Sequence, residues 1–215
     1  MNNSIKHVIF DWDGTIQDTI SNIVAAWQGA STELSLAPLS AVQIKSMIGL
    51  SLHAGIGKVE PNLSEAGIEA FIECYRKHYF ALEAQPSPLY RAIPELMEQL
   101  RTQGQTLTVG TGKGRQGLDR TLASSGISQH FSATRTACET ASKPSPLMVQ
   151  TLCEQVGIAP AQTMMVGDAY FDMAMARNAG AVGVGVSYGA GTIEELQRAQ
   201  PLAIIGEPLA LLNLL

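Results

Sequence analysis

Residues 5–15 read IKHVIFDWDGT, an apolar run that stops abruptly on two carboxylates. Short apolar runs bounded by turn residues are typical of strands buried in a parallel sheet. Two later apolar runs end in the same way, one on Thr111-Gly112-Lys113 and the other on Gly167-Asp168. Because the carboxyl ends of parallel strands meet along one edge of the sheet, we expect these polar residues to line one crevice. The pattern therefore predicts an active site.

Four aspartates belong to these strand ends: Asp11, Asp13, Asp168 and Asp172. Carboxylates gathered in one crevice oppose each other's ionisation unless a cation lies among them. Oxygen-rich sites with room for water and a substrate phosphate suit Mg²⁺. We therefore expect Mg²⁺ as the cofactor.

The order of the predicted elements indicates an α/β fold. Residues 19–87 favour helices with no strand-like run between them, and Pro86 and Pro88 end this helical part. Farther along, helices alternate with strand-like runs at 105–110, 131–133, 163–166, 181–186 and 203–205. This alternation is typical of a doubly wound parallel sheet, a Rossmann-like core with helices on both faces. We expect residues 1–18 and 88–215 to form the catalytic core and residues 19–87 a small all-helical cap domain.

Size and charge limit the classes of ligand. The chain has 215 residues, 46% of them hydrophobic, which is enough for a sizeable core with one small insertion. Its 14 Lys and Arg against 19 Asp and Glu give a net charge of -5, so we expect neither nucleic acid nor acidic lipid as a partner. A small soluble ligand fits this charge better.

The cysteines and the apolar segments bear on compartment. Cys74, Cys138 and Cys153 are odd in number, far apart and without CxxC spacing, which disfavours disulfides and a zinc site. No stretch approaches the roughly 20 apolar residues that span a membrane, and residues 1–10 do not resemble a signal peptide. We expect a cytoplasmic location and docking of the apolar residues 209–215 on the sheet.

At these motifs the chain resembles the haloacid dehalogenase superfamily. Residues 11–15 match the family's Asp-x-Asp-Gly-Thr motif, and the three other family motifs follow in order: Thr111 with Lys113, Lys143 in SKPSP, and Asp168 with Asp172. Four ordered motifs are far more specific than one. The resemblance covers the whole chain, and many relatives carry a helical cap where this chain has its insertion.

The resemblance implies a role for each motif residue. Asp11 would attack phosphorus and form an aspartyl-phosphate, and Asp13 would protonate the leaving oxygen and then activate water. Thr111 and Lys143 would bind and neutralise the phosphate. The metal would be held by carboxylate oxygens of Asp11 and Asp168 and the carbonyl oxygen of Asp13. Asp172 would lie nearby or act through water.

Other positions would support phosphate and substrate binding. Backbone N–H groups after Asp11, at Trp12 and the turn residue Gly14, would add donors to the phosphate. Gly112 stands where relatives often carry Asn, so we expect the phosphate contacts of that loop to differ from theirs. Basic groups in the cap could meet the other end of the substrate, although a solvated helical face is the favoured interpretation of each outside the loop at 49–53. These basic groups are Lys45, His53, Lys58, Arg76 and Lys77.

Each motif residue also has a plainer interpretation. Asp168 could cap a helix, Lys143 could be a solvated surface lysine, and Asp11 with Asp13 could form an ordinary polar turn. The coincidence of all four strand-end motifs favours the catalytic interpretation.

Taken together, these features predict an enzyme. Dehalogenases and phosphonate hydrolases of this family lack an acid at the position of Asp13, so phosphatase chemistry is favoured. The cap size and two segments, at 75–79 and 189–192, resemble the phosphoglycolate-phosphatase branch. We predict a Mg²⁺-dependent phosphatase that hydrolyses a small phosphorylated metabolite, phosphoglycolate-like or a sugar phosphate, through an aspartyl-phosphate. The alternatives are a sugar phosphomutase of the same fold and a non-catalytic phosphate-ligand or protein-binding module; the oligomeric state is not specified.

Overall fold

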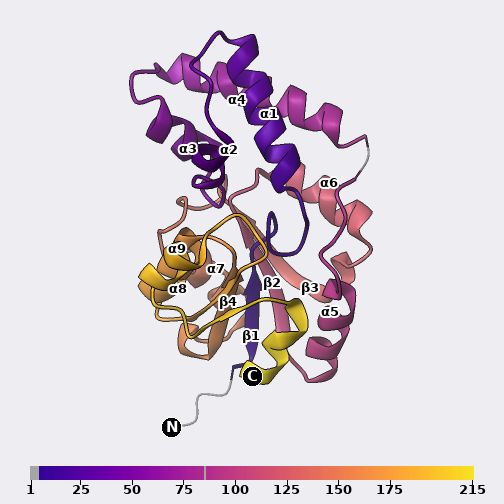
Figure 1. Ribbon diagram of the computed structural model, residues 1–215. Coiled ribbons are helices and arrows are strands. Elements are labelled where there is room, and N and C mark those ends of the chain that lie inside the picture. Colours follow the sequence, from indigo (N-terminus) through magenta and orange to yellow (C-terminus); the bar gives the residue numbers. More distant parts are fainter. Residues whose placement is uncertain (1–4, 85) are drawn as a thin grey trace.

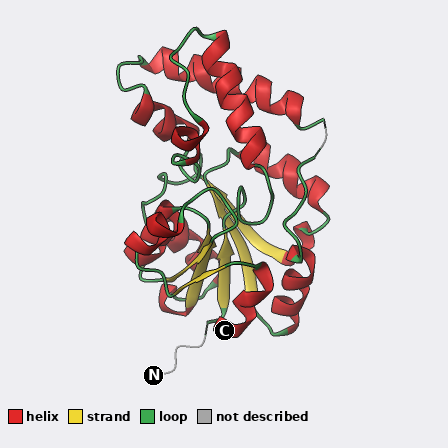
Figure 2. Ribbon diagram, in the orientation of Figure 1, coloured by secondary structure: helices red, strands yellow, loops and turns green. Residues whose placement is uncertain are grey.

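The computed structural model describes residues 5–84 and 86–215, and its centre is a six-stranded sheet (Figure 1, Figure 2). The strand order is β3-β2-β1-β4-β5-β6, and every pairing is parallel. The strands are β1 His7–Phe10, β2 Thr106–Thr111, β3 Phe131–Thr136, β4 Thr163–Gly167, β5 Val182–Val186 and β6 Ala203–Ile205. The predicted α/β fold class is therefore confirmed.

Helices cover both faces of this sheet. They are α5 Ile93–Thr102, α6 Arg115–Ser125, α7 Leu147–Val156, α8 Tyr170–Ala179 and α9 Ile193–Arg198, with short 3-10 turns η1 Ser128–His130, η2 Pro160–Gln162 and η3 Pro208–Leu214. Successive residues of a strand point to opposite faces. Accordingly, Val8 and Phe10 of β1 pack with α5, α6 and η3, whereas Ile9 packs with α7 and α8. The apolar C-terminal segment docks on the core as expected, with Leu211 fully buried.

Strand β1 occupies the topological centre of the sheet. It pairs with β2 on one side and with β4 on the other, so the chain winds outward in both directions from it. In such sheets ligands bind beyond the carboxyl ends of the strands at this reversal point. The fold therefore positions the residues that follow β1 and β4 at the expected crevice.

Four helices between β1 and β2 form a second cluster, above the sheet in Figure 1. They are α1 Ile20–Glu33, α2 Ala41–Lys45, α3 Leu52–Val59 and α4 Glu65–Leu82. Ser40, Ser51 and Ser64 each cap a helix, because their hydroxyls accept a backbone N–H of the first turn. The cluster has its own apolar core, in which Trp27, Ile44, Ile56 and Phe71 are buried.

Two segments connect this helical cluster to the sheet, and they run together. The Asp18 N–H donates to the Pro88 carbonyl at 2.9 Å, and the Tyr90 N–H donates to the Ile16 carbonyl at 3.0 Å. The Gln17 side-chain amide donates to the Ser87 carbonyl at 2.7 Å. The two connections are therefore joined to each other by hydrogen bonds.

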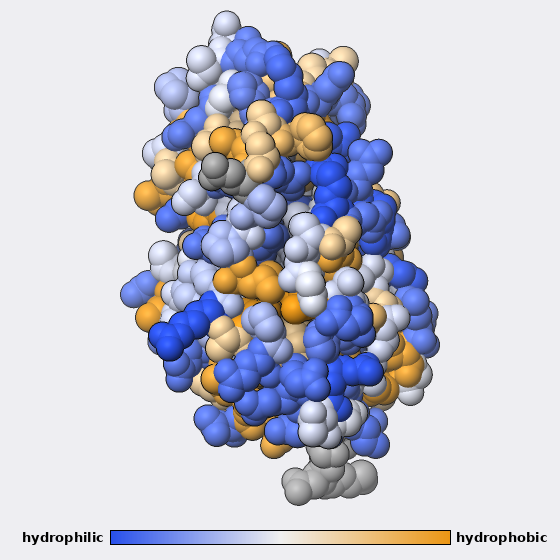
Figure 3. All heavy atoms as spheres, turned by 90° about the vertical axis from the view of Figure 1, so that its right-hand side faces the viewer, coloured by the Kyte–Doolittle hydropathy of each residue, from blue (hydrophilic) through white to orange (hydrophobic). Residues whose placement is uncertain are grey.

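The surface carries few apolar patches on the face shown in Figure 3. Within residues 5–84 and 86–215, no helix combines the length and the apolar character that a membrane crossing requires. On the face shown in Figure 3, hydrophilic side chains predominate and apolar ones form small separate patches.

His7 is buried in the sheet and shows a strong environmental effect. Its side chain is 0% exposed, and its two ring nitrogens contact Thr108 Oγ1 at 2.8 Å and Thr163 Oγ1 at 3.2 Å. Burial disfavours the charged imidazolium and lowers the pKa of His7 from 6.5 to about 4. The folded protein thus keeps this imidazole neutral between two threonines of the neighbouring strands.

The lowered pKa of His7 predicts a pH-dependent loss of stability. Between pH 6.5 and about 4 the unfolded chain binds one more proton at this residue than the folded chain, so the free energy of unfolding falls as the pH falls. Over that window the loss due to His7 is about 3 kcal/mol. The free energy of unfolding, measured with urea at several pH values, should fall with pH in the wild type. In His7→Asn it should fall less steeply, with a slope that corresponds to up to one proton fewer taken up on unfolding. The same slope in both proteins would contradict the prediction, and His130→Asn is the matched control.

Candidate active site

The carboxyl edge of the sheet gathers the residues that the sequence motifs predict. Asp11 and Asp13 follow β1, Thr111 ends β2, Asp168 follows β4 and Asp172 lies in the first turn of α8. Each of them is at most 9% exposed, although all are polar. Burial of this many polar groups at one edge costs free energy unless they bind one another or a ligand.

Lys143 lies at the centre of the carboxylate cluster. Its Nζ is 3.0 Å from Asp11 Oδ1 and 2.6 Å from Asp172 Oδ1, and its side chain is 0% exposed. The alternative interpretation of Lys143 as a solvated surface lysine is therefore wrong. One buried cation is shared by two buried carboxylates.

Asp168 is held by two donors from separate loops. Its Oδ1 accepts the Thr15 hydroxyl at 3.1 Å, and its Oδ2 accepts the Ala190 N–H at 2.7 Å. The N-cap of α8 is Ala169, so Asp168 does not cap that helix. Gly14, at φ +79°, passes so close to the Asp168 carboxylate that a Cβ would collide with it. The turn after β1 therefore requires glycine at this position.

The cluster strongly perturbs the titration of its members. Burial raises the pKa of Asp11 well above its usual value; Lys143 opposes this, and the charges of Asp172 and Asp168 add to it. Burial and the charge of Asp172 raise the pKa of Asp168 to about 7. Burial alone would lower the pKa of Lys143, but Asp11 and Asp172 raise it above its ordinary value. Lys143 therefore stays charged, while the carboxylates lack a full complement of positive charge.

The donor atoms of this cluster fit a hard divalent cation. Carboxylate oxygens of Asp11, Asp168 and Asp172 all lie within 4.8 Å of one another. Three buried carboxylates with one lysine leave a net negative charge that one divalent cation would neutralise, and an all-oxygen donor set suits Mg²⁺. The Asp13 carboxylate is not part of this group; it points to another partner.

That partner is Lys113, whose contribution the sequence analysis did not specify. Lys113 Nζ lies 3.0 Å from Asp13 Oδ1 and donates to the Tyr79 hydroxyl of α4 at 3.2 Å. The Thr19 hydroxyl also donates to Asp13 Oδ1, at 2.8 Å. Lys113 thus connects a carboxylate of the sheet edge to the helical cluster above it. Its place two residues after the strand-end Thr111 was the only sequence signal for this contact.

A cavity of about 530 Å³ opens between the sheet edge and helices α1, α2 and α4. Asp11, Asp13, Thr111 and Gly112 line it from the sheet side. The loop at 49–52 lines it from above and touches the sheet-edge loop, because a Cβ on Gly112 would meet the Gly49 and Leu50 carbonyl oxygens at 2.6 Å. Residues 49–52 therefore lie beside the cavity, and their contribution to substrate binding stays a prediction, whereas the His53 imidazole pairs with Glu65 at 2.8 Å.

The prediction for Trp12 concerns its backbone N–H, and the structure places its side chain away from the cavity. The indole is 0% exposed, packs in the core and donates to Gln17 Oε1 at 2.8 Å. It does not line the cavity. Its backbone N–H donates to Asp11 Oδ1 at 2.7 Å, so this residue acts on the site through its backbone.

The basic residues of the cap differ in whether they line the cavity. Arg76 and Lys77 line the cavity, whereas Lys45 and Lys58 do not. The Lys58 ammonium lies 5.5 Å from the centre of the Phe171 ring. Lys77 pairs with Glu33 at 2.8 Å, so its charge is already compensated.

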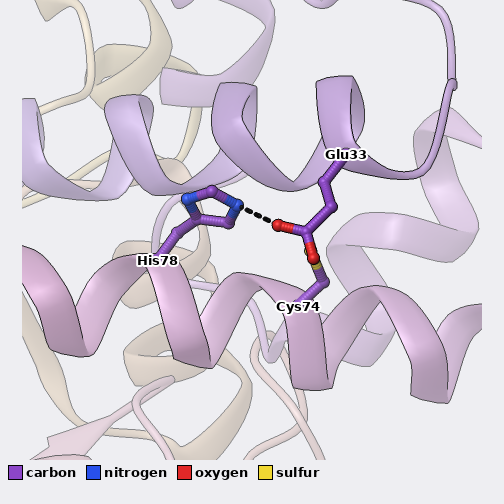
Figure 4. A group of neighbouring side chains, drawn as sticks. All are labelled: Glu33, Cys74 and His78. Carbon is purple, nitrogen blue, oxygen red and sulfur yellow. Dashed lines mark hydrogen bonds and ion pairs between the residues drawn. The ribbon is translucent and has the colours of Figure 1, made fainter.

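A separate group in the helical cluster was overlooked by the sequence analysis (Figure 4). Cys74 and His78, four residues apart on α4, face Glu33 at the end of α1, and their ligand atoms lie within 4.8 Å of one another. His78 Nε2 contacts Glu33 Oε2 at 2.9 Å, and Lys77 compensates Glu33 from the other side. Because Glu33 already has these two partners, we interpret the group as an ion-pair clamp between α1 and α4.

Comparison with known proteins places these features in a family. The sequence profile of the family "Haloacid dehalogenase-like hydrolase" matches residues 8–186. The chain is 32% identical to "Probable phosphatase IndB" of Dickeya dadantii over 92% of this chain and 88% of that protein. It is 30% identical to the phosphoglycolate phosphatase of Neisseria gonorrhoeae over 96% and 92%.

The solved structures agree with the sequence comparison. The crystal structure of a hydrolase from Pseudomonas syringae superposes with a TM-score of 0.89 at 28% identity, covering 97% of this chain and 96% of that one. Profile, relatives and fold thus agree with the four motifs that meet at the sheet edge. The chain is a phosphatase of the haloacid dehalogenase-like hydrolase family and belongs to its phosphoglycolate-phosphatase-like branch.

Proposed function

We propose that the protein is a Mg²⁺-dependent phosphatase that hydrolyses a small phosphomonoester through an aspartyl-phosphate on Asp11. The observation that supports this most is the buried cluster in which Lys143 contacts both Asp11 and Asp172, with Asp168 beside them. Such a concentration of buried charge is destabilising for a protein that only needs to fold. It is useful in an enzyme that must hold a metal and a phosphate.

In this mechanism Asp11 is the nucleophile. One carboxylate oxygen attacks phosphorus, a new P–O bond forms, and the bond to the leaving alcohol breaks. The Trp12 N–H and Lys143, at 2.7 and 3.0 Å, both contact Asp11 Oδ1 and hold that oxygen in place. The other oxygen, Oδ2, then faces the phosphate. Lys143 also supplies positive charge to the phosphoryl oxygens, and the Thr111 hydroxyl donates to one of them.

Asp13 serves as the acid and then as the base. It lines the cavity, where a leaving alcohol would lie, and gives that alcohol a proton as the P–O bond breaks. It then accepts a proton from the water that attacks phosphorus; the bond between phosphorus and the Asp11 oxygen breaks, inorganic phosphate leaves, and the Asp11 carboxylate is restored. Lys113 and Thr19 fix its carboxylate by hydrogen bonds during both steps.

Mg²⁺ would be held by Asp11, Asp168 and Asp172, with the Asp13 carbonyl as a further donor. When bound, it supplies the positive charge that lets the carboxylates ionise together and the phosphate approach them.

Inorganic phosphate release tests this proposal directly. A panel of small phosphomonoesters should release phosphate with Mg²⁺ and release none with excess chelator. Isotope-labelled phosphate that returned to another hydroxyl of a sugar, with no free phosphate, would indicate a phosphomutase instead. No turnover in a folded, metal-loaded protein would favour the non-catalytic binding module.

We also propose that residues 19–87 form a cap domain that opens to admit substrate and closes to exclude water. Its support is the separate apolar core of α1–α4 and the paired connections at 16–18 and 87–90. We expect the hinges at 17–19 and 85–88; residue 85 lies outside the described residues. Solution scattering should show compaction when Mg²⁺ and a phosphate mimic are added. Identical scattering profiles would count against closure.

A further inference from the structure

The cavity above the sheet edge is large for the substrate that the branch name suggests. Its volume of about 530 Å³ lies in the range of about 300–1,000 Å³ found for sites that bind drug-sized ligands. Phosphoglycolate adds only one CH₂ group and one carboxylate group to its phosphate. Such an ester would leave much of the cavity filled with water.

The upper part of the cavity is apolar and aromatic. Ile23, Ile44, Met47 and Ile48 line it from α1, from α2 and from the turn after α2. Trp27, Tyr75 and Tyr79, which we call the aromatic wall, form another side of it. Tyr75 and Tyr79 stack with ring centres 5.7 Å apart, and Trp27 meets Tyr75 edge-on at 6.0 Å. A surface of this kind binds flat, apolar groups.

The cations that line the cavity are mostly committed to carboxylates of the protein. Lys113 pairs with Asp13 at 3.0 Å, Arg115 with Glu139 at 2.6 Å and Arg120 with Glu83 at 3.0 Å. Lys77 pairs with Glu33 at 2.8 Å. Among the lysines and arginines in the described lining, only Arg76 lacks an ion pair, and Arg76 is exposed. A second negative charge on the substrate would therefore enter an apolar space without a dedicated cation, which is costly.

We propose that the substrate is a phosphomonoester whose alcohol carries an apolar ring and no second negative charge. The aromatic wall and the apolar side chains of α1 and α2 bind this group while Asp11 and Lys143 act on the phosphate. The inference rests on the proposed phosphatase function and identifies the class of its leaving group.

Four esters of primary alcohols separate the effects of size and charge. Ethyl phosphate is the small reference, phosphoglycolate adds a carboxylate, 2-phenylethyl phosphate adds a ring, and glucose 6-phosphate adds bulk without apolar surface. The ring should raise kcat/KM over ethyl phosphate by about 10- to 100-fold, as expected for burial of one phenyl group. Phosphoglycolate and glucose 6-phosphate should gain no such increase.

The outcomes distinguish the inference from the function on which it rests. Highest kcat/KM with phosphoglycolate would overturn the inference and leave the phosphatase function intact. Absence of phosphate release from all four esters would overturn the function itself. Tyr75→Leu should reduce the ratio of kcat/KM for the phenylethyl ester over the ethyl ester by at least about 5-fold, by loss of part of the aromatic contact. Because both esters are measured on one sample, a partly unfolded fraction does not change this ratio.

Introducing a cation tests the charge argument from the opposite direction. Leu50→Arg places a guanidinium in the lining of the cavity, and it should raise the ratio of kcat/KM for phosphoglycolate over ethyl phosphate by about 10-fold. Val42→Arg, at a residue 78% exposed and outside the lining, is the matched control and should leave the ratio unchanged. Arg76→Gln should also preserve it. A selective loss of phosphoglycolate turnover in Arg76→Gln would mean that Arg76 binds a substrate carboxylate, and the inference would fail.

Discussion

Replacement of Asp11 by asparagine should abolish phosphate release, with a loss of at least about 10⁴-fold in kcat. An amide oxygen cannot form the acyl-phosphate, so the covalent route is closed even though the side chain keeps its size. The melting temperature in chelator should not fall, because the substitution removes one of three mutually repelling buried carboxylates while Lys143 keeps Asp172 as a partner at 2.6 Å. Phosphate release and thermal unfolding measure the two effects separately.

The matched control for this substitution is Asp18→Asn. Asp18 is an exposed carboxylate in the segment between β1 and α1. Asp18→Asn removes the same charge as Asp11→Asn, and this variant should retain most of the activity. Acid-quenched samples analysed by mass spectrometry should contain a phosphorylated species in wild type and none in Asp11→Asn. Residual activity within 10-fold of wild type would assign the nucleophile to another group.

Replacement of Lys143 by methionine should damage both stability and catalysis. Methionine fits the volume but leaves Asp11 and Asp172 without their shared cation, at a cost of about 3–5 kcal/mol in the free energy of unfolding. Activity should fall at least about 10³-fold, because the phosphate loses its buried positive charge. Urea unfolding in the presence of chelator gives the first quantity, and phosphate release with Mg²⁺ gives the second.

A surface lysine provides the comparison for Lys143. Lys77→Met breaks the exposed pair with Glu33, which water already screens, so the free energy of unfolding should change far less than in Lys143→Met. Equal destabilisation by the two substitutions would show that the buried pair contributes no more than a surface pair. In that case the central place of Lys143 in the cluster would have to be abandoned.

The sheet could be predicted well because its strands are recognisable from short stretches of the sequence. Most strands are short apolar runs bounded by turn residues, and each parallel crossover contains at least one helix. The strand-end rule then placed Asp11, Thr111 and Asp168 at one edge without further information. Their mutual approach follows from topology, and the structure brings their neighbours Lys143 and Asp172 into contact there.

Other features depend on contacts that no local pattern encodes. The burial of the Trp12 indole, the Lys113–Tyr79 contact and the position of Glu33 beside His78 all join residues distant in sequence or in different layers. The sequence of helix α3 gives a weak signal, because the helix is short and contains Gly55 and Gly57, which lower helix propensity. Gly55 is tolerated because a Cβ there would lie 3.2 Å from the Trp27 ring, a tight contact that only tertiary packing reveals.

The paired connections between the cap and the sheet also bear on how the chain folds. Strands β1 and β2 are neighbours, yet they are separated by the insertion, so His7 must find Thr106. Closing a loop of that length costs about 4 kcal/mol of chain entropy. The hydrogen bonds from Asp18 to Pro88 and from Tyr90 to Ile16 bring the ends of the insertion together, at the exit of β1 and just before α5. Assembly of α1–α4 therefore shortens the loop that must close before β1 and β2 can pair. We expect the folding rate of the sheet to depend on how fast the insertion collapses.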